Sequence, residues 1–328
     1  MGESKKISIL GAGSWGTVLS HLLALSGHSI NLWSRSDDFV QHTKRIGRFT
    51  KPVELNLPEA VNLTSSLQES LIDIDLLICA VPSEAVKTLS QSIKVIESKI
   101  PLFLSVTKGL SVGSVKRMSE IWSETIDCDI AALSGPNLSA EAALAKPMKT
   151  VIASKNMESA QTIADCFHVP NFKTEITDDI VGVEIAGAAK NVIALIAGAW
   201  DGLSLGTSGK GAMLTRAVSE LSHLVDLMGG KRETVFSVAG LGDLYITCSS
   251  PLSRNYRAGY SLAKGKTLDE VHSELGGQVS EGVYTAPLIK QLSNKYEADL
   301  RVCDAANKLI AHDKLSLYQI EEMLVDLV

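Results

Sequence analysis

The stretch Lys6-Ile-Ser-Ile-Leu-Gly-Ala-Gly-Ser-Trp-Gly16 decides the fold of the first half of this 328-residue chain. Its first five residues form an apolar run that predicts a buried strand, and a helical pattern follows over residues 17–26. Gly27 is a typical helix-ending residue, and a second apolar run occupies residues 29–33. Strand, glycine-rich turn, helix and strand in this order predict a βαβ unit.

The three glycines of the turn indicate what this unit binds. In a G-x-G-x-x-G turn, the first glycine, here Gly11, permits the tight turn, and the second, Gly13, lets the backbone approach a pyrophosphate. The third, Gly16, allows close packing of the helix on the strand, and the helix N-terminus offers its free amides to the anion. Because strand, turn and helix follow in the required order, the motif favours a dinucleotide site over a plain structural turn.

Apolar runs alternate with helical patterns through the rest of the first half. Further strands are expected at residues 76–81, 102–106, 130–133, 150–153 and 171–175, with helices such as 83–96 and 114–124 among them. This alternation predicts an α/β Rossmann-type N-terminal domain with a mostly parallel sheet over residues 1–180. For residues 42–63 the sequence predicts no definite shape.

After residue 181 the strand pattern stops, and the sequence predicts an all-helical C-terminal domain over residues 181–328. Its expected helices span 182–200, 210–228, 231–238, 254–264, 267–275, 284–294, 299–311 and 316–327.

Composition narrows the class of function. Hydrophobic residues make up 45% of the chain and charged residues 21%, with a net charge of −6, which is typical of a globular protein and argues against a nucleic-acid partner. No uninterrupted run of eighteen apolar residues predicts a membrane span, and no secretory signal precedes the first strand, so we expect a cytoplasmic protein. The five cysteines are scattered, which predicts buried thiols and no metal site.

The residues after the second strand bear on the choice of dinucleotide. An acidic residue at this place binds the ribose 2′-hydroxyl of NAD, whereas an arginine accommodates the 2′-phosphate of NADP. Here Arg35 is followed by Asp37 and Asp38. We therefore expect NADPH to be preferred, with NADH possible.

Three later strands also end in small or turn-forming residues. The turns are Pro82-Ser83, Thr107-Lys108-Gly109 and Gly135-Pro136-Asn137. Ligands of open α/β sheets bind at the carboxyl ends of the strands, so these turns should lie along one edge with the glycine turn. Lys108 then either faces the ligand with its ammonium or is an ordinary surface lysine.

Lys190 lies within the apolar run 182–197, where a charge is unexpected. If the run is one helix, its neighbours three and four residues away are Ala186, Gly187, Ile193 and Ala194, and none is acidic. A lysine in such surroundings is pushed toward its neutral form, in which it accepts a proton, or it awaits an anionic ligand. The alternative is a lysine at the edge of the helix that extends to solvent.

The helical half contains a second polar cluster. Gly240-Leu-Gly-Asp243 precedes Ser253-Arg254-Asn255, and the latter opens a predicted helix. Exposed amides and a guanidinium both suit a phosphate dianion, although Ser253 also suits a plain helix N-cap.

Across nearly its whole length the sequence resembles the bacterial type of NAD(P)-dependent glycerol-3-phosphate dehydrogenase. The residues that carry the resemblance are Gly-Ala-Gly-Ser-Trp-Gly-Thr at 11–17, Thr-Lys-Gly-Leu at 107–110, Ser-Gly-Pro at 134–136, Gly-Ala-Ala-Lys-Asn-Val-Ile-Ala at 187–194, Gly-Leu-Gly-Asp-Leu at 240–244, Ser-Arg-Asn at 253–255 and Glu-Gly at 281–282.

The resemblance implies roles for individual residues. It implies that Lys190 exchanges the proton of the substrate oxygen, that Lys108 polarises the developing alkoxide, and that Asp243 orients Lys190. The implied substrate contacts are Lys108, Gly135, Asn137, Lys190, Asp243, Ser253, Arg254 and Asn255. The implied cofactor contacts, with the three glycines, are Ser14, Trp15, Arg35, Lys108, Ser139, Arg254, Val279 and Glu281.

The sequence departs from the family pattern at a few of these places. Asn137 stands where the family usually has serine or threonine, and Leu138 and Ser139 replace phenylalanine and alanine. Ser280 replaces a usual apolar residue beside Glu281.

The family implies reversible reduction of dihydroxyacetone phosphate to sn-glycerol 3-phosphate by a homodimer that supplies glycerophospholipid synthesis. A dehydrogenase for a 3-hydroxyacid or for 6-phosphogluconate also combines a dinucleotide domain with a helical domain. A regulator that binds NADPH without turnover is a further alternative, against which the absence of a recognisable DNA-reading module counts.

Overall fold

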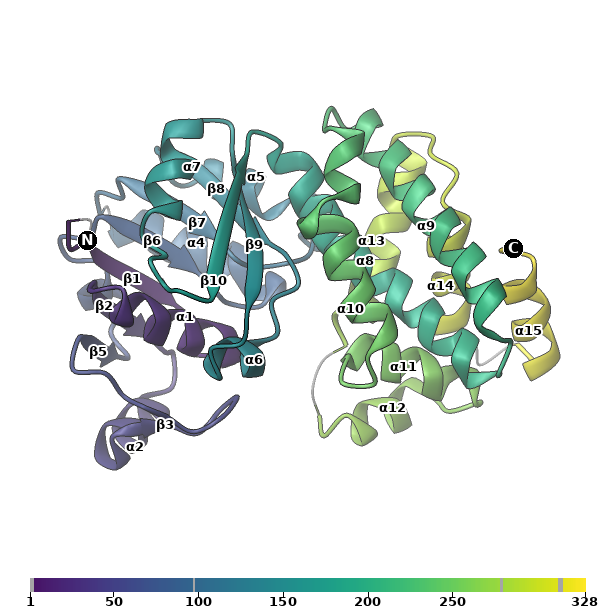
Figure 1. Ribbon diagram of the computed structural model, residues 1–328, viewed down its shortest axis with the longest axis horizontal. Coiled ribbons are helices and arrows are strands. Elements are labelled where there is room, and N and C mark those ends of the chain that lie inside the picture. Colours follow the sequence, from purple (N-terminus) through teal and green to yellow (C-terminus); the bar gives the residue numbers. More distant parts are fainter. Residues whose placement is uncertain (1–2, 97, 278–279, 312–314) are drawn as a thin grey trace. The chain divides into compact units, whose positions relative to one another are not determined.

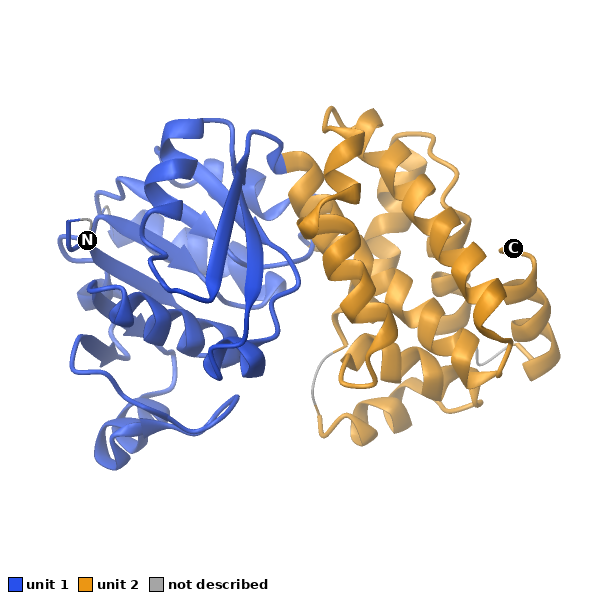
Figure 2. Cartoon of the chain, viewed as in Figure 1, with its two compact units in different colours: residues 1–111, 116–180 blue, residues 112–115, 181–328 orange. Residues whose placement is uncertain are grey.

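The computed structural model describes residues 3–96, 98–277, 280–311 and 315–328. Contacts divide the chain into two compact units (Figure 2). Unit 1 comprises residues 1–111 and 116–180, and unit 2 comprises residues 112–115 and 181–328.

Unit 1 is built on a sheet of eight strands in the order β10-β9-β8-β7-β6-β1-β2-β5 (Figure 1). The strands are β1 (Lys6–Leu10), β2 (Ser29–Trp33), β5 (Val61–Thr64), β6 (Leu76–Cys79), β7 (Leu102–Ser105), β8 (Asp129–Ser134), β9 (Met148–Ser154) and β10 (Phe172–Thr177). Neighbouring strands are parallel except β8 and β9. The predicted Rossmann-type domain with a mostly parallel sheet is therefore confirmed.

Both faces of the sheet are buried, as the near-continuous apolar strands require. Successive side chains of β6 alternate between two cores: Ile78 packs in one with α1 (Ser14–Leu25) and α7 (Met157–Ala164). Cys79 packs in the other with α4 (Ser83–Ile96) and α5 (Met118–Ser123). The alternation follows from the two-residue repeat of a strand.

Residues 42–63 contain short elements that the sequence does not reveal. The helix α2 (Asp37–Ile46) leads into a ribbon of β3 (Arg48–Phe49) and β4 (Leu55–Asn56), and β5 then pairs with β2. The two-residue strands β3 and β4 are too short to show a repeat, and β5, with the polar Asn62 in its middle, is not an apolar run. The small helices α3 (Leu67–Ser70) and α6 (Ser139–Ala143) complete unit 1. The predicted helix over 114–124 is confined to α5.

The described part of unit 2 is helical, as predicted. Its elements are α8 (Ile180–Gly202), α9 (Thr207–Leu227), the 3-10 helix η1 (Arg232–Phe236), the π-helix η2 (Val238–Gly242), α10 (Asp243–Ser249), α11 (Arg254–Ala263), α12 (Leu268–Glu274), α13 (Glu281–Lys295), α14 (Arg301–Ile310) and α15 (Leu317–Val325). The expected helix over 231–238 is instead η1 and the start of η2, and α10 was not predicted.

The central helix of unit 2 is α8, which is buried from residue 182 to residue 200. By length and composition α8 could cross a membrane, but 94% of its most apolar window is buried inside the protein, as in a core helix. Its backbone touches that of α11, since a Cβ on Gly259 would lie 1.8 Å from the carbonyl oxygen of Leu195. The few polar side chains of such a helix need partners within the protein.

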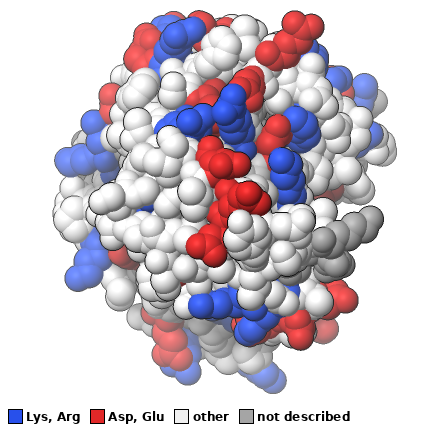
Figure 3. Space-filling view, turned by 90° about the vertical axis from the view of Figure 1, so that its right-hand side faces the viewer, with Lys and Arg blue, Asp and Glu red and all other residues white. Residues whose placement is uncertain are grey.

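On the face shown in Figure 3, acidic and basic side chains are interspersed. A surface that binds a nucleic-acid backbone instead collects basic residues.

Candidate active site

The glycine turn between β1 and α1 has the geometry that a pyrophosphate requires. Gly11 has φ +110°, and a Cβ there would lie 2.7 Å from the carbonyl oxygen of Ala80. A Cβ on Gly16 would meet the carbonyl oxygen of Gly11 at 1.9 Å, whereas one on Gly13 would meet nothing within 4 Å. Helix α1 begins at Ser14, followed by Trp15, and among the described residues no side chain caps its N-terminus. Open backbone and free amides therefore fit a dinucleotide pyrophosphate.

In the turn after β2, Arg35 is exposed, whereas the nearby Asp37 is engaged in a hydrogen bond within the protein. The Arg35 side chain is exposed and has no partner among the described residues. Asp37 begins α2, and its Oδ1 accepts a hydrogen bond from the Ser65 hydroxyl at 2.8 Å. The guanidinium is thus available to a ligand, and the Asp37 carboxylate is engaged within the protein.

Lys108 and Asn137 come from turns at the same edge of the sheet. The Lys108 ammonium donates to the carbonyl oxygen of Gly135 at 3.0 Å. The Thr150 hydroxyl lies 3.0 Å from Asn137 Oδ1, whereas Asn137 Nδ2 is buried without a partner in the described structure. A buried amide left without a partner is unfavourable unless a ligand supplies one, so this edge suits a polar ligand. Ser139 begins the short helix α6 close by in the chain.

In unit 2, Lys190 meets a carboxylate from a distant part of the chain. It is 8% exposed on α8, and its ammonium forms a salt bridge with Asp243, which is 0% exposed at the start of α10. The ammonium also donates to the Thr247 hydroxyl at 3.2 Å, and that hydroxyl donates to the Asp243 carbonyl oxygen at 2.6 Å. Lys190 is therefore a held, buried cation rather than a lysine that extends to solvent.

The π-helix η2 places Asp243. Ser237 caps this element by accepting from the amide of Ala239 at 3.1 Å, and Gly240 permits the tight path because a Cβ there would lie 2.1 Å from the carbonyl oxygen of Val235. Turns of π-helix occur often at functional sites. Gly240 thus permits the tight path of η2, after which Asp243 forms its salt bridge with Lys190.

The Ser-Arg-Asn motif opens α11, but its three residues behave differently. Ser253 is the N-cap and accepts from the amide of Tyr256 at 3.3 Å, as the plain structural interpretation expects. Arg254 is exposed and makes no hydrogen bond or ion pair with the residues described. The Asn255 side chain is buried and bonds to Asn191, Ser280 and the amide of Gly282.

Glu281 begins α13, and its Oε2 accepts from Asn191 Nδ2 at 3.0 Å. Val279, which the resemblance also assigns to the cofactor, lies outside the described residues.

Sequence reasoning missed three polar partners of the predicted site: Thr247, Asn191 and Thr150. Thr247 stands four residues after Asp243, a spacing that puts both on one face of a helix, but α10 itself was not predicted. Asn191 follows Lys190 directly and belongs to the same motif. For Thr150 the sequence offers no signal, because strand pairing alone brings it to Asn137.

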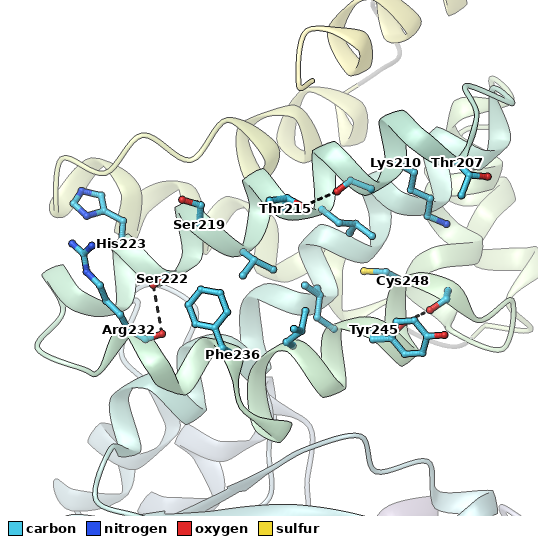
Figure 4. Close-up of a pocket in the computed structure, with 16 residues that line it drawn as sticks. Thr207, Lys210, Thr215, Ser219, Ser222, His223, Arg232, Phe236, Tyr245 and Cys248 are labelled. Carbon is cyan, nitrogen blue, oxygen red and sulfur yellow. Dashed lines mark hydrogen bonds between the residues drawn. The ribbon is translucent and has the colours of Figure 1, made fainter.

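A cavity of about 1020 Å³ lies elsewhere in unit 2, between α9, η1, η2 and α10 (Figure 4). Its lining combines apolar side chains such as Phe236 and Leu244 with polar ones such as Lys210, His223 and Arg232, and it includes none of the predicted site residues that the structure describes. In the described ranges, no three His, Cys, Asp or Glu side chains gather as metal ligands would.

The cysteines are free thiols, four of them buried and Cys128 half-buried. Burial raises the pKa of Cys79, Cys128 and Cys166 to about 11 and that of Cys248 to about 12, and it raises the pKa of Cys303 further.

Comparison with known proteins identifies the family of the chain. The family model for the N-terminus of NAD-dependent glycerol-3-phosphate dehydrogenase matches residues 6–160, and the model for the C-terminus matches residues 179–320. The glycerol-3-phosphate dehydrogenase [NAD(P)+] of Fusobacterium nucleatum is 37% identical over 98% of this chain and 96% of its own length. That of Prosthecochloris aestuarii is 36% identical over 98% and 97%.

A crystal structure of glycerol-3-phosphate dehydrogenase from Coxiella burnetii is similar along the whole chain, with a TM-score of 0.91 and 31% identity over 99% of this chain and 98% of that one. These matches cover both units and each of the motifs described above. The chain belongs to the family of NAD-dependent glycerol-3-phosphate dehydrogenases.

Proposed function

We propose that this enzyme reduces dihydroxyacetone phosphate to sn-glycerol 3-phosphate, and catalyses the reverse oxidation, with Lys190 as the proton-exchanging residue. The observation that carries this proposal is the buried contact of Lys190 with Asp243 and Thr247. An ammonium that is fixed and shielded from water is suited to a substrate oxygen on which charge develops.

The residues of unit 1 hold the dinucleotide. The glycine turn and the first amides of α1 bind the pyrophosphate, with Ser14 and Trp15 beside it. At the same sheet edge, Lys108 supplies a cation and Asn137 a free amide group, either of which can bind a polar group of the substrate or cofactor.

The residues of unit 2 stabilise the charge that develops on the substrate oxygen and exchange its proton. The bound nicotinamide supplies hydride in the reduction and accepts it in the oxidation. As the carbonyl oxygen becomes an alkoxide, the Lys190 ammonium stabilises its charge and donates the proton. Asp243 and Thr247 fix the ammonium in place, so little reorganisation is needed during the reaction.

The phosphate of the substrate is assigned to the first turn of α11. Arg254 offers an exposed guanidinium without a protein partner in the described chain, and a guanidinium fork matches phosphate oxygens. This assignment distinguishes a triose phosphate from an unphosphorylated keto acid.

We further infer that NADPH is preferred to NADH. The support is the exposed Arg35 after β2, together with the engagement of Asp37 by Ser65. From the family resemblance we also expect a cytoplasmic homodimer that supplies glycerophospholipid synthesis, and light scattering after size-exclusion chromatography measures its mass.

The direct test follows the nicotinamide absorbance with dihydroxyacetone phosphate and either NADPH or NADH. We expect oxidation that depends on the triose phosphate and is absent with an unphosphorylated keto acid. Tight NADPH binding without oxidation of any substrate would instead indicate a regulator.

The Lys190→Ala variant tests the proposed role of that residue. It should bind NADPH normally but lose turnover by about two to three orders of magnitude, the usual effect of removing one charge-stabilising donor. Lys149→Ala, which removes a surface lysine paired with Glu175, is the control. Near-normal turnover of Lys190→Ala would refute the assignment.

A further inference from the structure

Three consecutive residues at the start of α13 join a hydrogen-bonded chain with two asparagines. The Ser280 hydroxyl and the Gly282 amide both donate to Asn255 Oδ1, at 2.9 and 2.8 Å. Asn255 Nδ2 donates to Asn191 Oδ1 at 2.8 Å, and Asn191 Nδ2 donates to Glu281 Oε2 at 3.0 Å. We call these five residues the α13 relay.

The direction of every bond in the relay is fixed by chemistry. A backbone amide can only donate, so the atom that faces Gly282 must be the carbonyl oxygen of Asn255. The Asn255 amino group then faces Asn191, and the Asn191 amino group faces the Glu281 carboxylate, which can only accept when it is ionised. Each amide therefore has one orientation, and the last link holds a single oxygen of Glu281.

The Ser280 hydroxyl bonds to Asn255 of the relay and not to an amide in the first turn of α13. A serine at an N-cap normally accepts a bond from an amide of the first turn, but within the described structure the Ser280 hydroxyl accepts no bond from the first turn of α13. It is 6% exposed and donates to Asn255 instead. Since an apolar residue cannot make this bond, the serine hydroxyl gives Asn255 a second donor beside the Gly282 amide.

The relay also brings α13 against the helix of Lys190. A Cβ on Gly282 would lie 2.3 Å from the carbonyl oxygen of Asn191, so only glycine allows this approach. Asn191 is 3% exposed and follows Lys190 directly on α8. The residue that holds Glu281 and the residue that pairs with Asp243 are thus neighbours in one rigid, buried helix.

We propose that Ser280 and Asn191 are positioning residues, which orient the Glu281 carboxylate for the cofactor and hold it to the helix that carries Lys190. The inference rests on the proposed function and on the family resemblance, which assigns Glu281 to the dinucleotide. The second carboxylate oxygen of Glu281 makes no hydrogen bond within the described structure, and it is the atom available to the cofactor.

The first experiment compares serine variants in the full-length enzyme, with NADPH and dihydroxyacetone phosphate. Ser280→Ala removes one neutral hydrogen bond and should raise the KM for NADPH about fivefold, with kcat much less affected. Ser280→Thr keeps the hydroxyl and should restore most of the affinity. The matched control is Ser293→Ala, because Ser293 is also buried on α13 but donates only to the Ala298 carbonyl oxygen.

A merely structural loss would reduce the amount of active enzyme, and hence kcat, without a change in KM. Equal KM values for the Ser280→Ala variant and the wild type would overturn the role of Ser280.

The second experiment reverses one link of the relay. Asn191→Asp places a carboxylate against that of Glu281, and this repulsion should raise the KM for NADPH at least about tenfold. In the double variant Asn191→Asp/Glu281→Gln, the new aspartate accepts from both Asn255 and the new glutamine. Every link is then satisfied again, so the double variant should bind NADPH better than Asn191→Asp alone. A double variant no better than the single one would overturn the relay.

If the wild-type enzyme does not oxidise NADPH with dihydroxyacetone phosphate, the proposed function fails, and the relay is then judged by NADPH dissociation constants from nicotinamide fluorescence. The same order of affinities among the variants supports the relay, and no difference among them overturns it.

Discussion

At the scale of single residues, the ion pair of Lys190 and Asp243 is held out of water by the surrounding helices. Such a pair adds little to stability compared with apolar side chains of the same volume, because both charges lose their hydration. Breaking it by removing one partner is nevertheless costly, since the other charge is left alone. The pair is therefore better explained by the chemistry it supports than by stability.

Arg35 carries the proposed choice of cofactor, and its side chain is free of protein partners in the described residues. Arg35→Ala removes the cation assigned to the 2′-phosphate, so kcat/KM for NADPH should fall about tenfold or more. The value for NADH, which has no such phosphate, should change little. Steady-state kinetics with both cofactors measures the ratio, and Arg45→Ala on the nearby helix α2 is the control. An equal fall for both cofactors would contradict the assignment.

Glu220 on α9 should make stability depend on pH. Burial raises the pKa of this carboxyl from 4.5 to about 7, although the amides of Val302 and Arg301 and the charge of Arg216 oppose the rise. Below pH 4.5 the carboxyl is protonated in both the folded and the unfolded state. Between pH 4.5 and 7 the unfolded state releases the proton first, so the contribution of Glu220 to stability is lost as the pH rises.

Glu220→Gln keeps an acceptor for the amide of Val302, which lies 3.1 Å from the carboxylate, and it removes the ionisation. The variant should gain stability over the wild type as the pH rises from 5 to 8, by about 1–2 kcal/mol once partial exposure is allowed for. Urea unfolding at several pH values measures the difference. The exposed Glu321→Gln is the control for net charge, and a difference independent of pH would refute the prediction.

At the scale of elements, the sequence predicts the longer strands and helices and misses the shorter ones. Most strands of the central sheet are apolar runs, the long helices of unit 2 show a clear helical repeat, and the glycine turn indicates a dinucleotide. The strand β5 is not predicted. The two-residue strands β3 and β4 are invisible because they have no repeat. The helix α10 (Asp243–Ser249) has only seven residues, too few to show a helical repeat, and only the family resemblance indicates the partner of Lys190.

The crossing of α8 and α11 depends on glycine. Gly259→Ala would place a Cβ 1.8 Å from the Leu195 carbonyl oxygen, so the helices must move apart, at a cost of about 3 kcal/mol. Gly211→Ala on α9 meets nothing within 4 Å and should stabilise the protein by about 0.5–1 kcal/mol, because alanine restricts the unfolded chain. Denaturant unfolding measures whether the free energy of unfolding falls in Gly259→Ala and rises in Gly211→Ala. A Gly259→Ala variant as stable as the wild type would show that the crossing has room.

At the scale of the whole molecule, the chain divides its tasks between two units. A fragment of residues 1–180 contains all of unit 1 and both of its cores. We expect this fragment to unfold cooperatively and to bind NADPH more weakly than the full chain, since Glu281 is absent, and not to oxidise it with dihydroxyacetone phosphate, since Lys190 is absent. Circular dichroism and nicotinamide fluorescence test the two expectations. A fragment that folds without binding NADPH would place essential cofactor contacts in residues 181–328.

The burial of the cysteine thiols should slow their oxidation. Only a thiolate reacts quickly with peroxide or alkylating reagents, and at pH 7 a thiol whose pKa is about 11 is ionised in about one molecule in ten thousand. None of the cysteines belongs to the proposed catalytic set, so their slow oxidation leaves the reacting groups untouched. The enzyme should therefore keep working under oxidative stress that inactivates dehydrogenases with a nucleophilic cysteine.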